Sequence, residues 1–246
     1  KGKMAEWGAI VLAAGQGKRM HSPVAKQFLL LDGRPVLYYS LKAFEESGAK
    51  RIILVTGENE IEYCRREIVE KYGFRKVSDI VAGGAERYHS VRNGLRVFSR
   101  YFSPEDLVLI HDGARPLVEA GIISRAEEAA GRYGACTAAM PVKDTIKEAD
   151  GEQFAKKTLD RSRLWQIQTP QAFSCGLICR AYEELFADPG RQAGVTDDAM
   201  VVEAMTGVRV RLVEGSYENL KVTTPEDLVI AECLLKRRRL ESGKDH

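Results

Sequence analysis

The chain has 246 residues, of which 44% are hydrophobic and 29% are charged, and its formal net charge is +2. This composition is typical of a soluble globular protein with one large or two small α/β domains. No apolar run is long enough to span a membrane, and the net charge is too small for a typical nucleic-acid-binding protein. The N-terminal residues lack the layout of a signal peptide, and the five scattered cysteines have no metal-ligand spacing. We therefore expect a cytoplasmic protein that binds neither membranes nor nucleic acids.

Short apolar runs and helical patterns alternate along the chain. The predicted strands are Ala9–Ala14, Arg51–Thr56, Lys76–Val81, Leu107–His111, Ala135–Val142 and Val208–Val213. The predicted helices cover about residues 36–47, 58–72, 86–99, 119–132 and 175–187. Residues 52–55 are apolar on both faces of their strand, which is typical of a sheet buried between two helix layers. The sequence predicts a three-layer, mostly parallel, Rossmann-like α/β sheet within one domain over residues 5–240.

A polar segment, residues 143–163, interrupts this alternation. Its central Asp150-Gly151 pair is a hairpin signal. A hairpin with so few apolar side chains cannot be buried in the core, so we expect it to project as an arm. Such an arm either clasps a second subunit or remains a surface hairpin, and composition alone does not choose between them.

The C-terminal part predicts one more helix. Thr224 followed by Pro225 is typical of a helix N-cap with proline in the first turn. The basic run 236–239 lies at the end of this helix, where it complements the helix dipole. No aromatic residues interleave with it, so we interpret it as a solvated helix end rather than a nucleic-acid site.

The first predicted strand runs directly into Gly15-Gln16-Gly17-Lys18-Arg19-Met20, and Lys26 follows shortly after. Glycines allow the backbone to approach a ligand closely, and the basic side chains supply positive charge. A Rossmann fingerprint would need glycine in place of Met20, and a Walker loop would need Gly-Lys-Ser/Thr. The loop therefore indicates a polyphosphate site of a third type.

Further polar residues follow other predicted strands, at the sheet edge where parallel α/β proteins bind ligands. They are Gly83, Gly84, Ser90, His111, Asp112, Arg115, Lys143 and Thr145, and the late segment 219–223 adds Lys221. Alternatives stay open for several of them. Gly83-Gly84 forms a plain turn or a flat surface for a base, and Asp112 caps a helix, orders a metal ion or binds a sugar hydroxyl. We expect His111 and His89 to pack or form hydrogen bonds.

The basic residues at these strand ends indicate an anionic ligand. Arg19 and Lys26 come from the glycine loop region, and Arg115 and Lys221 follow other strands. Like charges gathered at one site are costly unless a counter-charge is present. A nucleoside triphosphate together with a second phosphate would supply it.

The chain resembles the 2-C-methyl-D-erythritol 4-phosphate cytidylyltransferase family over about residues 7–235. The motifs that carry the resemblance are residues 12–20, 26–27, 83–87, 90–91, 111–116, 164–165, 169–171, 196–197 and 219–223. The glycine loop alone indicates only the wider nucleotidyltransferase group, whereas the combination with the other motifs is more specific. Ala25 departs from the proline that the family usually has before the catalytic lysine.

The resemblance implies roles for individual residues. Catalytic roles are implied for Arg19, Lys26, Arg161 and Lys221; cytidine triphosphate (CTP) contacts for Ala13, Ala14, Gly15, Gly83, Ser90 and Asp112; and contacts to the polyol phosphate for Asp112, Arg115, Thr145, Arg161, Thr169, Thr196 and Lys221. It also implies Mg²⁺ or another divalent cation, with Asp112 as a possible ligand, and a homodimer clasped by the 143–163 arm.

The implied reaction is transfer of a cytidylyl group from CTP to 2-C-methyl-D-erythritol 4-phosphate in the non-mevalonate isoprenoid pathway. A phosphate monoester is largely dianionic at neutral pH, so it needs no catalytic base to attack the α-phosphorus. Two alternatives remain: a cytidylyltransferase for another polyol phosphate such as ribitol 5-phosphate, and a non-catalytic sensor of nucleotide sugars on the same fold.

Overall fold

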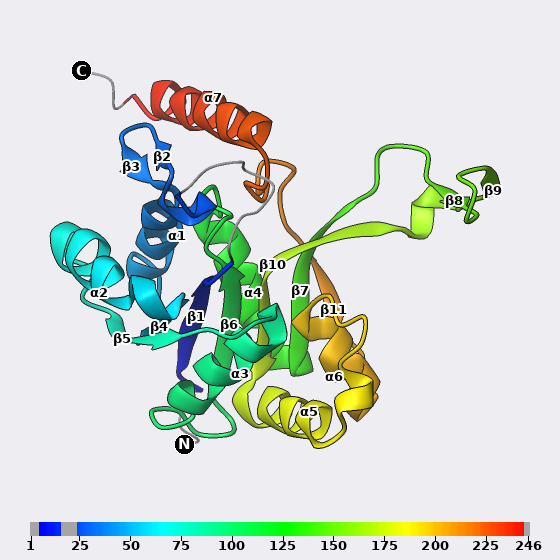
Figure 1. Cartoon of the computed structure of the whole chain (residues 1–246), viewed down its shortest axis with the longest axis horizontal. Coiled ribbons are helices and arrows are strands. Elements are labelled where there is room, and N and C mark those ends of the chain that lie inside the picture. Colours follow the sequence, from blue (N-terminus) through cyan, green and yellow to red (C-terminus); the bar gives the residue numbers. More distant parts are fainter. Residues whose placement is uncertain (1–4, 16–23, 244–246) are drawn as a thin grey trace.

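A seven-stranded sheet forms the centre of the protein in a computed structural model that describes residues 5–15 and 24–243 (Figure 1). In order across the sheet, the strands are β11 (Arg211–Glu214), β7 (Ala135–Pro141), β10 (Trp165–Ser174), β6 (Leu107–Asp112), β1 (Trp7–Ala13), β4 (Ile52–Thr56) and β5 (Val77–Ala82). All neighbouring pairs are parallel except those of β10, which runs antiparallel to β6 and β7. The predicted mostly parallel sheet is confirmed.

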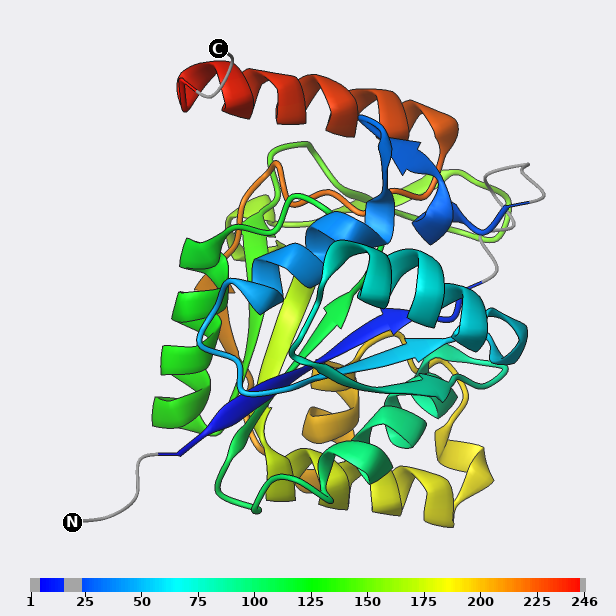
Figure 2. The ribbon, with the colours of Figure 1, turned by 90° about the vertical axis from the view of Figure 1, so that its left-hand side faces the viewer.

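Helices cover both faces of this sheet, as the apolar runs predict (Figure 2). One face packs against α1 (Val36–Glu45), the helical segment α2 (Ile61–Tyr63) with η4 (Cys64–Glu70), and α4 (Ala120–Tyr133). The other face packs against α3 (Arg87–Phe98), α5 (Cys175–Ala187) and α6 (Asp198–Thr206). Alternate residues of one strand serve opposite layers: Val11 faces the first and Ile10 the second, and both are fully buried. This alternation explains why the central strands are apolar on both faces.

The polar segment 143–163 forms the predicted projecting hairpin. Strands β8 (Lys147–Ala149) and β9 (Ala155–Thr158) pair antiparallel well away from the main sheet (Figure 1). The Asp150 carboxylate accepts hydrogen bonds from the backbone N–H groups of Glu152 and Phe154, which closes the turn. Both strands are exposed along their whole length. The hairpin therefore gains no stability from this chain's own core.

The C-terminal helix α7 (Pro225–Glu241) lies across the small hairpin of β2 (Leu30–Leu31) and β3 (Arg34–Pro35) (Figure 2). Its predicted N-cap is confirmed: the Thr224 hydroxyl accepts from the Asp227 N–H, and the Asp227 carboxylate accepts from the Thr224 N–H. The interpretation of the basic run as a solvated end is wrong in part, because Arg237, Arg238 and Arg239 form ion pairs with other segments of the chain. Lys236 pairs within the helix, with Glu232, and Arg237 makes a second pair within the helix, with Glu241.

Some elements lie outside those that the sequence predicts. They include strand β10, helix α6 and the β2–β3 hairpin. The remaining short helices are η2 (Lys26–Phe28), η3 (Glu58–Glu60), η5 (Arg161–Arg163) and η6 (Pro189–Arg191). Within residues 5–15 and 24–243, the structure contains no helix with the length and apolar character needed to cross a membrane.

Candidate active site

The end of β1 forms one wall of a cavity at the carboxyl edge of the sheet. Gln27, almost fully buried, donates from its side-chain amide to the carbonyl oxygens of Ala13 at 2.6 Å and Gly15 at 3.2 Å. These bonds fix the backbone where the glycine loop begins, and Lys26 is held beside it in η2. Ala25 has φ −59°, an angle that proline also adopts, so this departure from the family pattern leaves the backbone compatible. The predicted catalytic Arg19 lies outside the described residues.

The turn after β5 forms the opposite wall and requires glycine at two positions. A Cβ atom at Gly83 would lie 2.5 Å from both Ala14 Cβ and Ser90 Oγ, and one at Gly84 would lie 2.3 Å from His89 Cβ. The Ser90 hydroxyl accepts from the Gly84 N–H at 3.1 Å. These close approaches give a flat backbone surface, as a base-binding wall requires.

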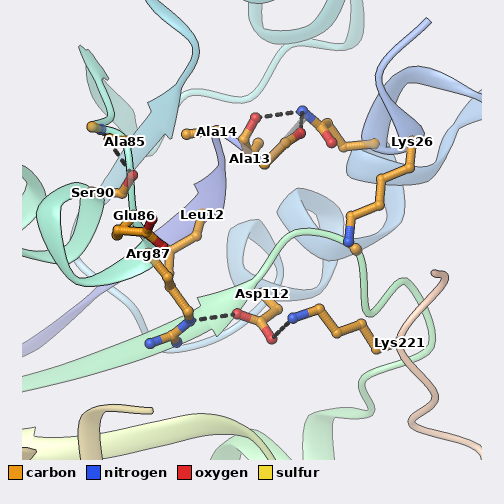
Figure 3. A pocket seen from close by; sticks show the side chains of 14 residues that line it. Leu12, Ala13, Ala14, Lys26, Ala85, Glu86, Arg87, Ser90, Asp112 and Lys221 are labelled. Carbon is orange, nitrogen blue, oxygen red and sulfur yellow. Dashed lines mark hydrogen bonds and ion pairs between the residues drawn. The ribbon is translucent and has the colours of Figure 1, made fainter. Parts of the chain in front are cut away.

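A cavity of about 540 Å³ lies between these walls (Figure 3). Its lining includes the predicted nucleotide contacts and both predicted catalytic lysines: Ala13, Ala14, Gly15, Lys26, Ser90, Asp112 and Lys221. Gly83 lines a smaller adjoining cavity of about 280 Å³ together with Ala14, Gly15 and Gly84. The side chains of Lys26 and Lys221 reach toward Asp112 from two different segments (Figure 3). The geometry therefore joins a glycine-lined backbone surface to a group of cations.

Asp112, at the end of β6, is the centre of the charged group. Its carboxylate lies 3.0 Å from Lys221 Nζ, 3.3 Å from Arg87 Nε and 3.8 Å from Arg115 Nε. Burial alone would raise the pKa of Asp112, but the three cations outweigh burial and hold that pKa well below its usual range. The carboxylate therefore remains ionised and keeps three basic side chains together.

Arg87 has a second and closer anionic partner. Its guanidinium forms two parallel hydrogen bonds of 3.0 Å to the carboxylate of Asp198, which is completely buried. The Tyr182 hydroxyl donates to the same carboxylate at 2.6 Å. Burial disfavours the charged guanidinium, but Asp198 and Asp112 raise the pKa of Arg87 above its ordinary value. Tyr182, Asp198 and Arg87 thus form a buried chain of polar contacts that ends at Asp112.

A second cavity, of about 380 Å³, lies on the other side of the same ion pairs. It shares Arg87, Asp112 and Lys221 with the first cavity. Five of the residues predicted to contact the polyol phosphate belong to the body of the domain, and all five line this cavity: Asp112, Arg115, Thr169, Thr196 and Lys221. Two adjoining cavities with cations at their junction suit two anionic ligands that react with each other.

The two remaining predicted substrate contacts, Thr145 and Arg161, lie on the arm. Both side chains are exposed, and Arg161 donates to the Lys143 carbonyl oxygen. Neither lines the two cavities of its own chain. The arm leaves the sheet at the carboxyl end of β7 and extends outward from the body of the domain (Figure 1).

Several residues that shape the site were given no role of their own from the sequence. Gln27, Arg87, Gln171 and Asn219 lie within the motifs of the family resemblance, whereas Gln168, Tyr182 and Asp198 lie outside them. Arg87 begins a helix right after the predicted glycine turn, which is a signal for a ligand-side position. The role of Asp198 depends on a contact with a residue 111 positions away in the chain, so local pattern carries no sign of it.

His111 acts as the expected hydrogen-bonding residue. Its imidazole is fully buried and lies 2.9 Å from Thr169 Oγ1 and 3.1 Å from the Arg115 carbonyl oxygen. The Thr169 hydroxyl in turn accepts from the Asp112 N–H at 3.0 Å. The histidine therefore supports the backbone on which the charged group is built.

The pH dependence of stability follows from this burial. Burial lowers the pKa of His111 from 6.5 to about 4, so between these values the unfolded chain binds a proton that the folded chain does not. Stability contributed by this group is present above pH 6.5 and is lost as the pH falls, by about 2 kcal/mol between pH 7 and pH 5. Urea unfolding at the two pH values should show a correspondingly smaller loss in His111→Gln. An equal loss in both proteins would contradict this assignment.

Comparison with known proteins gives one consistent answer. The sequence profile of the 2-C-methyl-D-erythritol 4-phosphate cytidylyltransferase family matches residues 8–237. The chain belongs to this family. A curated member from Lachnospira eligens is 51% identical over 229 residues, with 93% of this chain and 98% of that protein covered. One from Lachnoclostridium phytofermentans is 48% identical over 231 residues, with 94% and 97% covered.

Solved structures support the same family assignment. The 4-diphosphocytidyl-2C-methyl-D-erythritol synthase of Anaerococcus prevotii superposes with a TM-score of 0.79 at 32% identity, covering 94% of this chain and 96% of that one. The 2-C-methyl-D-erythritol 4-phosphate cytidylyltransferase of Thermus thermophilus gives a TM-score of 0.74 at 32% identity, covering 94% and 99%. The resemblance expected from the sequence is confirmed, and with it the nucleotidyltransferase fold.

The chemistry of the site's donors limits the kind of metal ion that it suits. Within the described part of the chain, no three histidine, cysteine, aspartate or glutamate side chains gather into a metal cage. Asp112 lies at the junction of the cavities, and its cationic neighbours hold the pKa of its carboxyl well below its usual range. A single carboxylate suits Mg²⁺, which usually takes its other ligands from water and substrate phosphates.

Proposed function

We propose that this chain transfers a cytidylyl group from CTP to 2-C-methyl-D-erythritol 4-phosphate, giving 4-diphosphocytidyl-2-C-methyl-D-erythritol and pyrophosphate. The observation that carries the proposal is the junction of two cavities at Arg87, Asp112 and Lys221, in a member of this family. The first cavity, of about 540 Å³, has the glycine-lined surface and takes the nucleotide. The second cavity, of about 380 Å³, takes the polyol phosphate.

The proposed chemistry is electrostatic. The phosphate monoester is dianionic at neutral pH and attacks the α-phosphorus in line, so the barrier comes from bringing anions together and from charge growing on the phosphoryl oxygens. Lys26, at the nucleotide side, stabilises that charge together with Arg19 of the glycine loop. Lys221, ion-paired to Asp112, faces both cavities and holds the attacking phosphate. No acid–base pair is needed.

A magnesium ion bound with the triphosphate would neutralise part of the phosphate charge, and the Asp112 carboxylate would be its protein ligand. The protein's own part is to keep that carboxylate ionised. It does so by surrounding Asp112 with basic side chains and by holding Arg87 on a separate carboxylate, that of Asp198.

We propose further that the active form is a homodimer in which the arm completes the partner's acceptor cavity. The arm projects from the domain and carries Thr145 and Arg161, whose side chains are exposed. Exposed apolar side chains on and beside it, Phe154 and Trp165, suit burial against a second copy. A monomer at working concentrations in sedimentation analysis would contradict this part of the proposal.

The variant Arg161→Ala tests the arm's role. Loss of a charge-assisted hydrogen bond to the acceptor phosphate should raise the KM for the polyol phosphate on the order of tenfold, with the KM for CTP nearly unchanged. Arg163→Ala, two residues away on the same arm, serves as the matched control. If Arg161→Ala instead weakened only the use of CTP, the assignment of the arm to the acceptor side would be wrong.

The experiment that tests the whole proposal is pyrophosphate release measured with CTP or uridine triphosphate and with either polyol phosphate. Release with CTP and 2-C-methyl-D-erythritol 4-phosphate supports the proposal. Faster release with ribitol 5-phosphate would favour the other acceptor, and CTP binding without release under any condition would favour a sensor.

A further inference from the structure

Helix α7 contacts the segments that carry three of the site's basic residues. Its apolar face packs into one cluster with the hairpin that follows Lys26, the loop that follows Arg115, and the loop that contains Lys221. The buried members of this cluster are Leu31, Val36, Leu117, Val222 and Ala231. The three loops belong to distant parts of the sequence, and α7 is the element on which they converge (Figure 2).

Arg238 makes the most extensive of the polar contacts from α7. Its guanidinium donates to Glu218 Oε2 at 3.0 Å, to the Leu117 carbonyl oxygen at 3.0 Å and to Glu119 Oε1 at 2.6 Å. The Arg238 side chain is 24% exposed, whereas Lys236 on the same helix is 59% exposed and forms its ion pair with Glu232 of that helix. Arg239 forms an ion pair with Asp32 at the tip of the β2–β3 hairpin. One helix turn thus binds both the loop before Lys221 and the hairpin after Lys26.

The contacts continue from Glu218 to the reacting side of the site. The next residue, Asn219, is fully buried and accepts a hydrogen bond on its carbonyl oxygen from Arg115 at 2.7 Å. Its side-chain amide donates to the Thr169 carbonyl oxygen at 2.9 Å. Beyond it, the Val222 N–H donates to the Ala114 carbonyl oxygen at 2.8 Å. Lys221 is therefore held between two anchored residues, and Arg238 holds the start of that loop.

We propose that α7 is a positioning element for the reaction and that Arg238, through Glu218 and Leu117, sets the placement of Lys221 against Asp112. This inference rests on the proposed function. Arg238 touches neither cavity, so its effect is on where the lysine amine lies and not on the reacting atoms. Small displacements of an orienting group lower the rate of the chemical step more than they lower binding.

The test compares Arg238→Met with the matched control Lys236→Met, which removes the same charge from the same helix. We expect Arg238→Met to lower kcat on the order of tenfold while the Kd for CTP, measured by calorimetry, changes by less than about twofold. Lys236→Met should match the wild type. Arg238→Lys, which keeps one of the contacts, should recover part of the loss.

A double-mutant cycle separates positioning from general loosening of the fold. If Arg238 acts through Lys221, the loss of kcat from Arg238→Met should largely disappear in a Lys221→Ala background. Equal losses in both backgrounds, or a normal kcat for Arg238→Met, would overturn the inference. If Arg238→Met does not fold, Glu218→Gln applies the same cycle from the loop side, with the same two outcomes. Absence of turnover in the wild type would instead count against the proposed function.

Discussion

Replacing Lys26 by alanine should lower kcat on the order of 10²–10³, the effect of losing one preorganised donor to a developing oxyanion. Lys26 lines the nucleotide cavity, in the short helix that Gln27 anchors to the end of β1. Because Gln27 keeps these backbone contacts, the substitution removes a charge and leaves the loop in place. The KM for CTP should rise much less than kcat falls.

Steady-state kinetics with both substrates check this result. Lys42→Ala is the matched control, since Lys42 is an exposed lysine whose ion pair is with Glu46, the C-cap of its own helix, and it should leave kcat unchanged. Near-normal turnover of Lys26→Ala with only a raised KM would show that Lys26 binds the ground state and does not stabilise the transition state.

Replacing Asp198 by alanine should destabilise the fold by about 3 kcal/mol, because it leaves the Arg87 guanidinium half-buried beside the Tyr182 hydroxyl without its main counter-charge. Asp198 is completely buried and receives both parallel bonds from Arg87. The freed guanidinium should also turn more fully toward Asp112 and disturb the ion pair between Asp112 and Lys221, so kcat should fall as well.

Urea unfolding and kcat, measured on the same samples, check the second prediction. Tyr182→Phe removes one hydrogen bond and keeps the ion pair, so its cost should be only about 1 kcal/mol. Glu67→Ala, which removes an exposed carboxylate paired with Lys71, should cost less than about 0.5 kcal/mol. An Asp198→Ala protein as stable as the Glu67→Ala protein would show that the buried pair does not hold Arg87.

The parallel strands and their helices were predictable from sequence because their residues alternate between two apolar layers. Strand β10 was not, since its buried part carries Gln168, Thr169 and Gln171, which break the apolar pattern. These polar groups are buried at low cost because they are hydrogen-bonded: Gln171 bonds to Asp197 and to the Ala199 N–H, and Gln168 to Ser216. All of these partners lie far along the chain. Such partners are visible only after folding.

Some residues of the candidate site were likewise predictable from the sequence, and others were not. Ala14, Gly15, Lys26 and Ser90 lie next to strand ends, and the topology of parallel sheets together with the family resemblance was enough to place them in one cavity. The Arg87–Asp198 pair and the anchoring of the Lys221 loop by α7 depend on contacts between residues that lie far apart in the sequence, on separate elements. The basic run at the end of α7 was misinterpreted for this reason, since its acidic partners are spread over three other segments.

The most direct test of a two-substrate transfer is pyrophosphate release from CTP by the purified protein, with and without 2-C-methyl-D-erythritol 4-phosphate and with Mg²⁺ present or chelated. We predict release only when CTP, the polyol phosphate and Mg²⁺ are all present, with uridine triphosphate and ribitol 5-phosphate much poorer substitutes. CTP binding without pyrophosphate release in the complete mixture would contradict the account.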